Sequence, residues 1–257
     1  MNPIEFLRKY QQLQYNIMFD ELINLRPAII GYSKIDKTTF WNNALLNQLV
    51  SEEQLNQIQE KMHSLNRTPA IYFEDRPDLK PLVKLLVKNK YKKNFEDSWM
   101  FYQDKEIDTS LFSSVKKVET KEDLKIFLKL FDECFQKDDP QNPYGLLGDY
   151  IKVAEKAWNK HHQTNRIECF IVYDKKEPVA VSTLTNYKGI GYISNVGSLI
   201  KVRGKGFGKL ATLFCVYVSK KHGNSIHCLA TEEGTYPNEF YKRIGFKTLF
   251  NGVCYSI

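Results

Sequence analysis

Three glycines in five residues give this chain a segment that could bind an anion. Gly204, Gly206 and Gly208 stand between an apolar run, residues 192–202, and a segment with the apolar spacing of a helix, residues 209–222. Glycine lets the backbone approach a ligand closely, and the first amides of a helix have no partner within it. The spacing therefore predicts a strand, a glycine turn and a helix whose first amides bind a phosphate or pyrophosphate.

Basic side chains surround the same glycines. Arg203, Lys205 and Lys209 would add positive charge beside the amides. The string Gly, four residues, Gly-Lys-Ser/Thr of a Walker loop does not occur in the chain, and Lys209 stands where the dinucleotide-binding pattern GxGxxG needs its last glycine. The residues thus favour a phosphate-bearing ligand other than those that these two motifs bind.

Two segments carry a family resemblance. Arg203, Gly206 and Gly208, spaced R-x-x-G-x-G after a strand, resemble the acetyl-CoA signature of the GCN5-related N-acetyltransferases (GNAT). Downstream, residues 235–246 (TYPNEFYKRIGF) resemble the second motif of that family, a short helix ending in F-Y-x-x-x-G-F. The resemblance covers residues 115–257 and implies the α/β (α+β) fold of the family, a mixed central β-sheet flanked by helices.

The resemblance also implies a binding site for acetyl-CoA as co-substrate. In the family, the strand before the loop parts from its neighbour, so that its amides pair with the pantetheine arm, and the loop amides hold the pyrophosphate. Asn238 would contact the pantetheine arm, and Tyr241 would lie near the sulfur as the acid that protonates the leaving thiolate. The remaining positions carried over to the cofactor are Val196, Gly197, Ser198, Arg203, Gly204, Lys205, Gly206, Phe207, Gly208 and Lys209.

The general base is harder to find in the sequence. Ser194 and Asn195, which lie on the expected central strand, are not basic. Glu232 and Glu233, at the end of the next expected strand, are the closest acidic pair along the chain, and Glu232 is taken as the candidate base acting through water. A solvated strand end is the alternative interpretation of this pair.

The resemblance therefore implies an N-acetyltransferase that transfers an acetyl group to an amine by direct attack. The acceptor, a peptide, a protein or a small molecule, stays open, and acidic residues in the loop KDDPQNPYG (residues 137–145) favour a cationic one. Two alternatives remain: a protein that binds CoA without turnover, and a peptidyl-type transferase that uses aminoacyl-tRNA.

The chain of 257 residues is long enough for two modules. Residues 68–102 predict the order strand, helix, strand, which the expected elements of residues 225–257 repeat. We therefore expect a tandem arrangement, with a degenerate GNAT-like module in residues 1–112 and the catalytic module in residues 113–257. A helix is expected from Ile4 to about Leu25, and another over residues 51–66.

Composition excludes several classes of protein. The net charge of +7 is spread over mixed charges, and no nucleic-acid-binding motif occurs, so nucleic acid is not an expected partner. The five cysteines form no C-x-x-C pair, which predicts buried thiols and neither a metal site nor a disulfide. The sequence also lacks a signal-peptide pattern and an apolar run that could span a bilayer. The expected location is the cytoplasm, without membrane contact.

Overall fold

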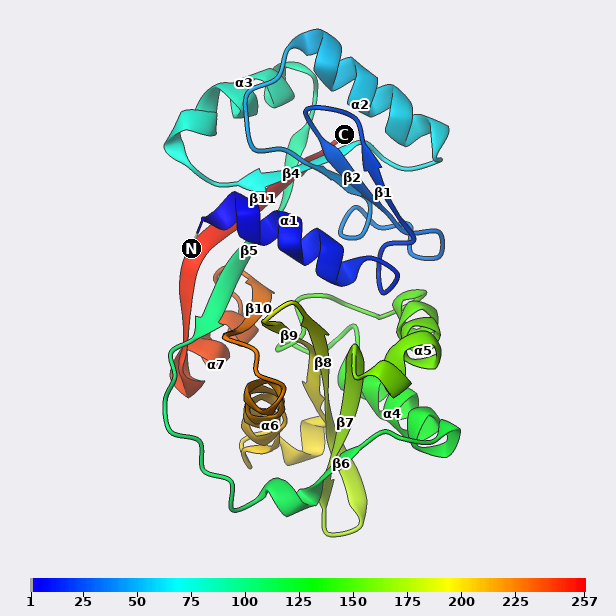
Figure 1. Cartoon of the computed structure of the whole chain (residues 1–257), viewed down its shortest axis with the longest axis vertical. Helices are drawn as coiled ribbons and strands as arrows, with labels where there is room; N and C mark the ends of the chain where they lie inside the picture. The colour runs from blue at the N-terminus through cyan, green and yellow to red at the C-terminus, as the bar shows by residue number, and fades with distance from the viewer. Residues whose placement is uncertain (1) are drawn as a thin grey trace. The chain divides into compact units, whose positions relative to one another are not determined.

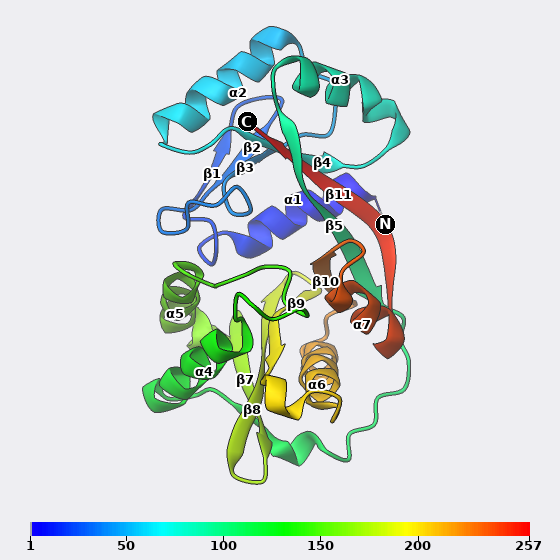
Figure 2. The same cartoon turned by 180° about the vertical axis from the view of Figure 1, so that it is seen from behind.

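The computed structural model describes residues 2–257 and divides them into two compact units (Figures 1 and 2). The first unit contains the residues up to Ser98 together with Phe250–Ile257, and the second contains Trp99–Leu249. The division falls inside two strands, β5 (Lys92–Tyr102) and β11 (Phe246–Ser256). The two units are defined by contacts within the fold, whereas the expected boundary after residue 112 separates two modules along the chain. That module boundary stays a prediction.

The first unit combines a sheet with three α-helices. Its strands follow the order β1, β2, β3, β4, β11, in which β3 and β4 are parallel and the other pairs are antiparallel. Ser51 and Gln54 form a capping box at the start of α2. Its elements, besides the starting part of β5 and the end of β11, are α1 (Pro3–Gln14), β1 (Glu21–Asn24), β2 (Ile29–Tyr32), β3 (Asn43–Leu45), α2 (Glu52–Ser64), β4 (Ala70–Glu74), η1 (Pro77–Leu79) and α3 (Lys80–Lys88).

The helix expected from Ile4 to Leu25 is wrong in its second half. Helix α1 ends at Gln14, and Asn16, with φ 64°, turns the chain. Strand β1 then pairs with β2, with Glu21 opposite Tyr32. The apolar residues between helix and strand are buried and continue a helix-like spacing, so the periodicity alone did not reveal the turn.

The second unit places helices on both faces of a sheet with the strand order β5, β10, β9, β8, β7, β6. Helices α4 and α5 lie on one face, and α6 lies on the other, as Figure 1 shows. At the start of α4, Thr120 is the N-cap residue and forms a capping box with Asp123. Its elements, besides the shared strands, are η2 (Phe112–Ser114), β6 (Val115–Lys117), α4 (Lys121–Cys134), α5 (Tyr150–His161), η3 (His162–Thr164), β7 (Ile167–Asp174), β8 (Glu177–Tyr187), β9 (Ile190–Ser198), η4 (Ile200–Val202), α6 (Phe207–Lys221), β10 (Ile226–Glu232) and α7 (Tyr236–Ile244).

The expected repeat of strand, helix and strand is present as β4-α3-β5 and β10-α7-β11. In each case, however, the last strand extends beyond the unit in which the repeat begins. In the first unit, the end of β11 pairs with β4, with Cys254 opposite Tyr72, and in the second unit the end of β5 is the neighbour of β10. Each sheet is thus completed by a strand from the other copy of the repeat.

The cysteines have the environment that the sequence predicts. All five are buried and free, and burial raises the pKa of the Cys134 and Cys169 thiols to about 12. Within residues 2–257, no helix combines the length and apolarity needed to cross a bilayer.

Candidate acyl-transfer site

The two central strands of the second unit part from each other. Strands β9 and β10 run parallel and pair at three positions, the last of which joins Tyr192 and Cys228. Strand β9 continues to Ser198 and β10 to Glu232 without further pairing to each other in the described chain. Because both strands continue without a shared ladder, this edge of β9 has backbone groups available to a ligand.

A β-bulge marks the place where β9 changes direction. Ser194 lies opposite Thr183 and Gly197 opposite Val181, so β9 holds one more residue than β8 in this interval. Asn195 lies in the bulge with φ 54°, and Tyr150 Oη donates a hydrogen bond to its Oδ1 at 2.7 Å. The bulge is therefore held by a side chain of α5.

Backbone alternation determines which amides of β9 face the open edge. Leu199 donates its amide to the Val179 carbonyl, toward β8, at 3.0 Å. Since successive amides point to opposite sides of a strand, those of Ser198 and Val196 point away from β8. Gly197 has another role, because a Cβ built there would lie 2.6 Å from Cys134 Cβ at the end of α4. This glycine allows close packing of α4 against the strand.

The start of α6 is free of protein caps. Gly206 is the N-cap residue, with φ 89° and no side-chain hydrogen bond, and Leu210 is the first residue to donate back, to the Gly206 carbonyl. In the described part of the chain, no protein acceptor is bound by the amides of Phe207, Gly208 and Lys209. A Cβ at Gly204 or Gly206 would meet no atom within 4 Å. The loop thus offers an open anion site.

Arg203 is engaged elsewhere than the sequence suggested. Its Nη1 donates to Asp139 Oδ1 at 2.5 Å and its Nη2 to Asp139 Oδ2, in a bidentate pair. The Asp139 side chain is 1% exposed, and the guanidinium lowers the pKa of its carboxyl. Lys205 and Lys209 are exposed, and neither forms an ion pair within residues 2–257. These lysines, rather than the Arg203 side chain, supply free positive charge near the amides.

Asn238 has a buried acceptor that no protein group satisfies. The residue is fully buried in α7, and its Nδ2 donates to Thr231 Oγ1 at 3.1 Å. No donor reaches its Oδ1 among the described residues. Because an unpartnered buried acceptor is costly, an amide N–H of a ligand would be stabilised there.

Tyr241 lies three residues further along the same helix face. Its ring packs edge-on against Phe240 and Phe246 and is 8% exposed. Burial raises the pKa of its phenol well above the usual range, and the neighbouring Tyr144 phenol and Cys215 thiol add to the shift. Tyr241 therefore stays protonated over the physiological pH range.

The two glutamates after β10 differ in their surroundings. Glu233 pairs with Lys242, with Oε1 and Nζ 4.0 Å apart, on the surface. Glu232 is half-buried and forms no ion pair among residues 2–257, and burial raises the pKa of its carboxyl. A carboxylate with a raised pKa is a better proton acceptor near neutral pH, which favours Glu232 of the two.

Sequence reasoning missed two residues of the loop between α4 and α5. Asp139 neutralises Arg203, so it is not free to attract a cationic acceptor as expected for this loop. Tyr144 accepts a hydrogen bond from the Glu232 amide at 3.5 Å and lies close enough to Tyr241 to raise the pKa of its phenol. A sequence signal for these contacts is hard to find, because they join residues 64, 88 and 97 positions apart.

Residues 2–257 contain no cluster of metal-ligating side chains. In the part of the chain that the structure describes, no group of three or more histidine, cysteine, aspartate or glutamate side chains could hold a metal ion. His227 Nδ1 lies 2.8 Å from Ser219 Oγ, and burial lowers the pKa of its imidazole. This contact gives His227 a structural role near the start of β10.

Solved structures share this architecture at low sequence identity. A GCN5-related N-acetyltransferase from Kribbella flavida is 15% identical, with a TM-score of 0.66 over 97% of this chain and 94% of its own. A functionally unknown conserved protein from Staphylococcus epidermidis ATCC 12228 is 13% identical, with a TM-score of 0.64 over 92% of this chain and 93% of its own. A tandem GNAT protein from the clavulanic acid biosynthesis pathway is 9% identical, with a TM-score of 0.57 over 90% of this chain and 78% of its own.

No protein-family model and no curated protein sequence matches the chain. The structural likeness extends over nearly the whole chain, and one of the similar proteins is itself a tandem. The mixed α/β fold and its resemblance to this family, both expected from the sequence, are confirmed. The chain has the fold of the GCN5-related N-acetyltransferases.

Proposed function

We propose that this protein is an acetyl-CoA-dependent N-acetyltransferase that transfers the acetyl group directly to an amine. The observation that carries the proposal is the parted edge of β9, which leads directly to the uncapped amides at the start of α6. Acetyl-CoA has an extended pantetheine arm that leads to a pyrophosphate. Its two parts match an open strand edge that is followed by an anion site.

Different residues would bind different parts of acetyl-CoA. The amides of Gly204 and of residues 206–209, with the Lys205 and Lys209 side chains beside them, would hold the pyrophosphate, whereas the Lys205 amide donates to the Val202 carbonyl at 3.3 Å. The amides of Val196 and Ser198 would pair with the pantetheine arm. The unpartnered Oδ1 of Asn238 suits an amide N–H of that arm. Arg203 contributes by fixing the loop through Asp139.

The chemical step requires a neutral amine and a proton for the sulfur. Glu232 would take a proton from the acceptor ammonium, directly or through a water molecule, so that the amine nitrogen can attack the thioester carbonyl. As the carbon–sulfur bond breaks and the amide forms, the buried Tyr241 phenol would donate its proton to the thiolate. The proton lost by the amine and the proton gained by the sulfur thus pass through two separate side chains.

The proposal is tested by titrating acetyl-CoA, CoA and ATP into the full-length protein and by following thiol release with a panel of amines. We expect one site that prefers acetyl-CoA and CoA to ATP, and thiol release that depends on the amine. Equal affinity for all three ligands, or none, would overturn the proposed site. Selective binding without amine-dependent release for any amine or peptide would favour a CoA-binding protein instead.

A further inference from the structure

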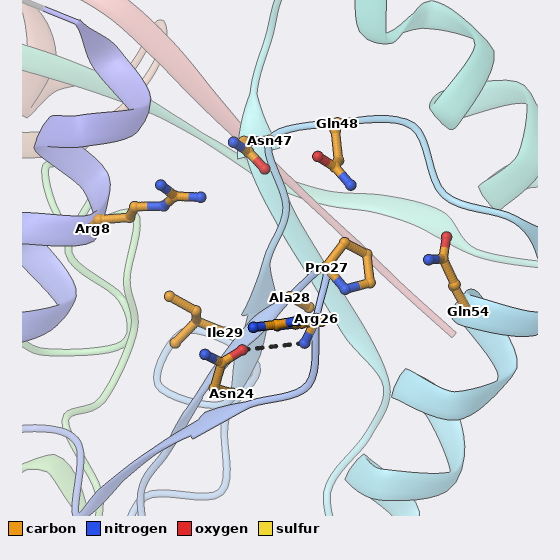
Figure 3. Close-up of a pocket in the computed structure, with 9 residues that line it drawn as sticks. All are labelled: Arg8, Asn24, Arg26, Pro27, Ala28, Ile29, Asn47, Gln48 and Gln54. Atoms are coloured by element: carbon orange, nitrogen blue, oxygen red, sulfur yellow. Dashed lines mark hydrogen bonds between the residues drawn. The ribbon is translucent and has the colours of Figure 1, made fainter.

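The first unit contains a pocket of about 560 Å³ that belongs to no part of the site described above (Figure 3). Its walls come from α1, the turn between β1 and β2, the loop after β3 and the first turn of α2. We propose that this pocket binds a small anionic molecule that carries a phosphate or carboxylate group. The proposal is independent of the acyl-transfer function.

The charge of the pocket is entirely positive. Arg8 and Arg26 line it, and no acidic side chain does. Neither guanidinium forms an ion pair or donates a hydrogen bond to another group within residues 2–257. Figure 3 shows Arg8 extending from α1 toward the segments that carry the other lining residues. Two unpaired guanidinium groups without a carboxylate favour an oxyanion, which arginine binds with paired hydrogen bonds.

Four carboxamide side chains add hydrogen-bond donors to the same pocket. The Asn24 oxygen already accepts the Arg26 amide at 3.2 Å, and the Gln54 oxygen accepts the Ser51 amide at 3.0 Å. Their NH₂ groups, like those of Asn47 and Gln48, donate to no protein acceptor in the described chain. These four NH₂ groups, together with the two guanidinium groups, suit a ligand with several oxygen acceptors.

The walls of the pocket are held in place from outside. Gln11 Nε2 donates to the Ile29 carbonyl at 3.1 Å and ties α1 to β2. Arg76 Nη2 donates to the Asn47 carbonyl at 2.7 Å and fixes the loop after β3. Ala28, which also lines the pocket, is fully buried. These contacts fix the backbone that carries the lining residues, so the ligand has to order only their side chains.

The volume indicates more than an inorganic ion. Pockets of about 300–1,000 Å³ hold organic ligands, so a bare phosphate would fill only a part of this one. The apolar side chains of Pro27 and Ile29 provide a surface for the organic part of the ligand. The ligand class is therefore a phosphorylated or carboxylated small molecule.

The test uses calorimetric titration of glucose 6-phosphate, citrate and uncharged glucose into the full-length protein. We expect one of the two anions to bind with a dissociation constant below about 1 mM, and glucose not to bind. Binding of glucose 6-phosphate alone would assign a phosphate ligand, and binding of citrate alone a carboxylate. Failure of both anions to bind would overturn the proposal.

Matched variants distinguish this pocket from other anion sites. Arg8→Gln with Arg26→Gln should weaken binding at least tenfold, whereas Lys80→Gln with Lys84→Gln, which removes the same charge from the surface of α3, should change it less than twofold. A Gly206→Trp variant, which blocks the start of α6, should retain the binding. Equal affinity in the double arginine variant, or loss of binding in Gly206→Trp, would show that the anion does not bind in this pocket. If the double variant is unfolded, Arg8→Gln alone provides the comparison, since Arg8 is exposed.

Discussion

The two units begin corresponding helices in opposite ways. Helix α2 of the first unit follows β3, and α6 of the second follows β9, each after a short loop. At α2, Ser51 Oγ accepts a hydrogen bond from the Gln54 amide at 3.2 Å, and Gln54 Oε1 accepts one from the Ser51 amide at 3.0 Å. At α6, Gly206 offers no side chain, so the first amides stay available. At the start of α2, backbone amides are hydrogen-bonded by side chains of the helix, whereas at the start of α6 they are open to an anionic ligand.

A second comparison concerns the helices that follow β4 and β10. The C-cap of helix α7 is Gly245, with φ 110°, and the chain turns after α3 at Lys90, with φ 68°. Tyr241 lies four residues before the first of these positions, and Leu86, which is fully buried, lies four residues before the second. A leucine cannot donate a proton, so the first unit keeps the packing role of this position without the chemistry that we propose for Tyr241. The fold tolerates both, because packing needs only an apolar side chain there.

The largest effect is expected from a bulky side chain at the open start of α6, which tests the difference between the two helix starts. Gly206→Trp places a bulky side chain among the amides and at a positive φ that side chains rarely adopt, so acetyl-CoA affinity should fall at least a hundredfold. Gly223→Trp is the matched control, because Gly223 has φ 74° and open space at the other end of the same helix. Calorimetry measures both variants. Unchanged affinity in Gly206→Trp would refute the role of this loop.

The second comparison is tested by removing only the phenol oxygen of Tyr241. Tyr241→Phe should keep acetyl-CoA affinity within about twofold and lower kcat by about 10²-fold or more, because proton donation to the thiolate is lost. Steady-state kinetics and calorimetry give the two quantities. Tyr217→Phe, a half-buried tyrosine of α6, should change neither. A parallel loss of affinity and kcat would show that Tyr241 is a packing residue.

The pair of glutamates allows a test of the base. With a raised pKa, the Glu232 carboxyl is protonated at low pH, and kcat/KM should rise with pH as it ionises. Glu232→Gln should remove this rise and lower the rate at neutral pH by about 10²-fold. Glu233→Gln should keep the profile, since Glu233 pairs with Lys242 on the surface. An unchanged pH profile in Glu232→Gln would exclude this residue as the base.

A substitution in the Arg203–Asp139 pair tests whether this pair anchors the loop. Asp139→Asn should lower the free energy of unfolding by about 2 kcal/mol at pH 7, because it leaves the guanidinium with a neutral partner. The lowered pKa of Asp139 means that the wild type holds this contribution above the unfolded value of about 3.9 and loses it as the pH falls.

Denaturant unfolding at pH 7 and at about pH 3 measures this difference. Wild type and Asp139→Asn should differ less at the lower pH, because it lies below the unfolded pKa of about 3.9, where the contribution of the pair is being lost. Asp138→Asn, at the neighbouring exposed residue, is the control and should have little effect at either pH. An equal stability of Asp139→Asn and the wild type would mean that the pair does not anchor the loop.

The smallest expected effect concerns the closed helix start. Ser51→Ala removes the hydroxyl that accepts the Gln54 amide and should lower the free energy of unfolding by about 1 kcal/mol. Ser64→Ala, at the exposed end of the same helix, should lower it by less than about 0.5 kcal/mol. Equal effects of both substitutions would show that the cap does not stabilise α2.

Local sequence signals predicted much of this structure. The capping boxes at Ser51 and Thr120 were readable because they depend on residues three positions apart. The glycine turn before α6 was equally readable, since its conformation depends on residues that are adjacent in the chain. The end of α1 was not, because the buried residues after Gln14 continue the apolar spacing of the helix.

Other features depend on residues distant in the sequence. The sequence could not assign Arg203 to Asp139, place Tyr144 beside Glu232, or indicate that β5 and β11 end in the sheets of the other unit. The same holds for the pocket around Arg8 and Arg26, whose walls come from four separate segments.

The sequence by itself determined the glycine loop, the helix starts and the resemblance to an acetyltransferase, because each rests on short spacings that act through local backbone geometry. Only the tertiary structure decided which charges are free, which polar atoms are unsatisfied and where β9 and β10 part. These properties depend on burial and on contacts between distant segments, and both exist only once the chain has folded.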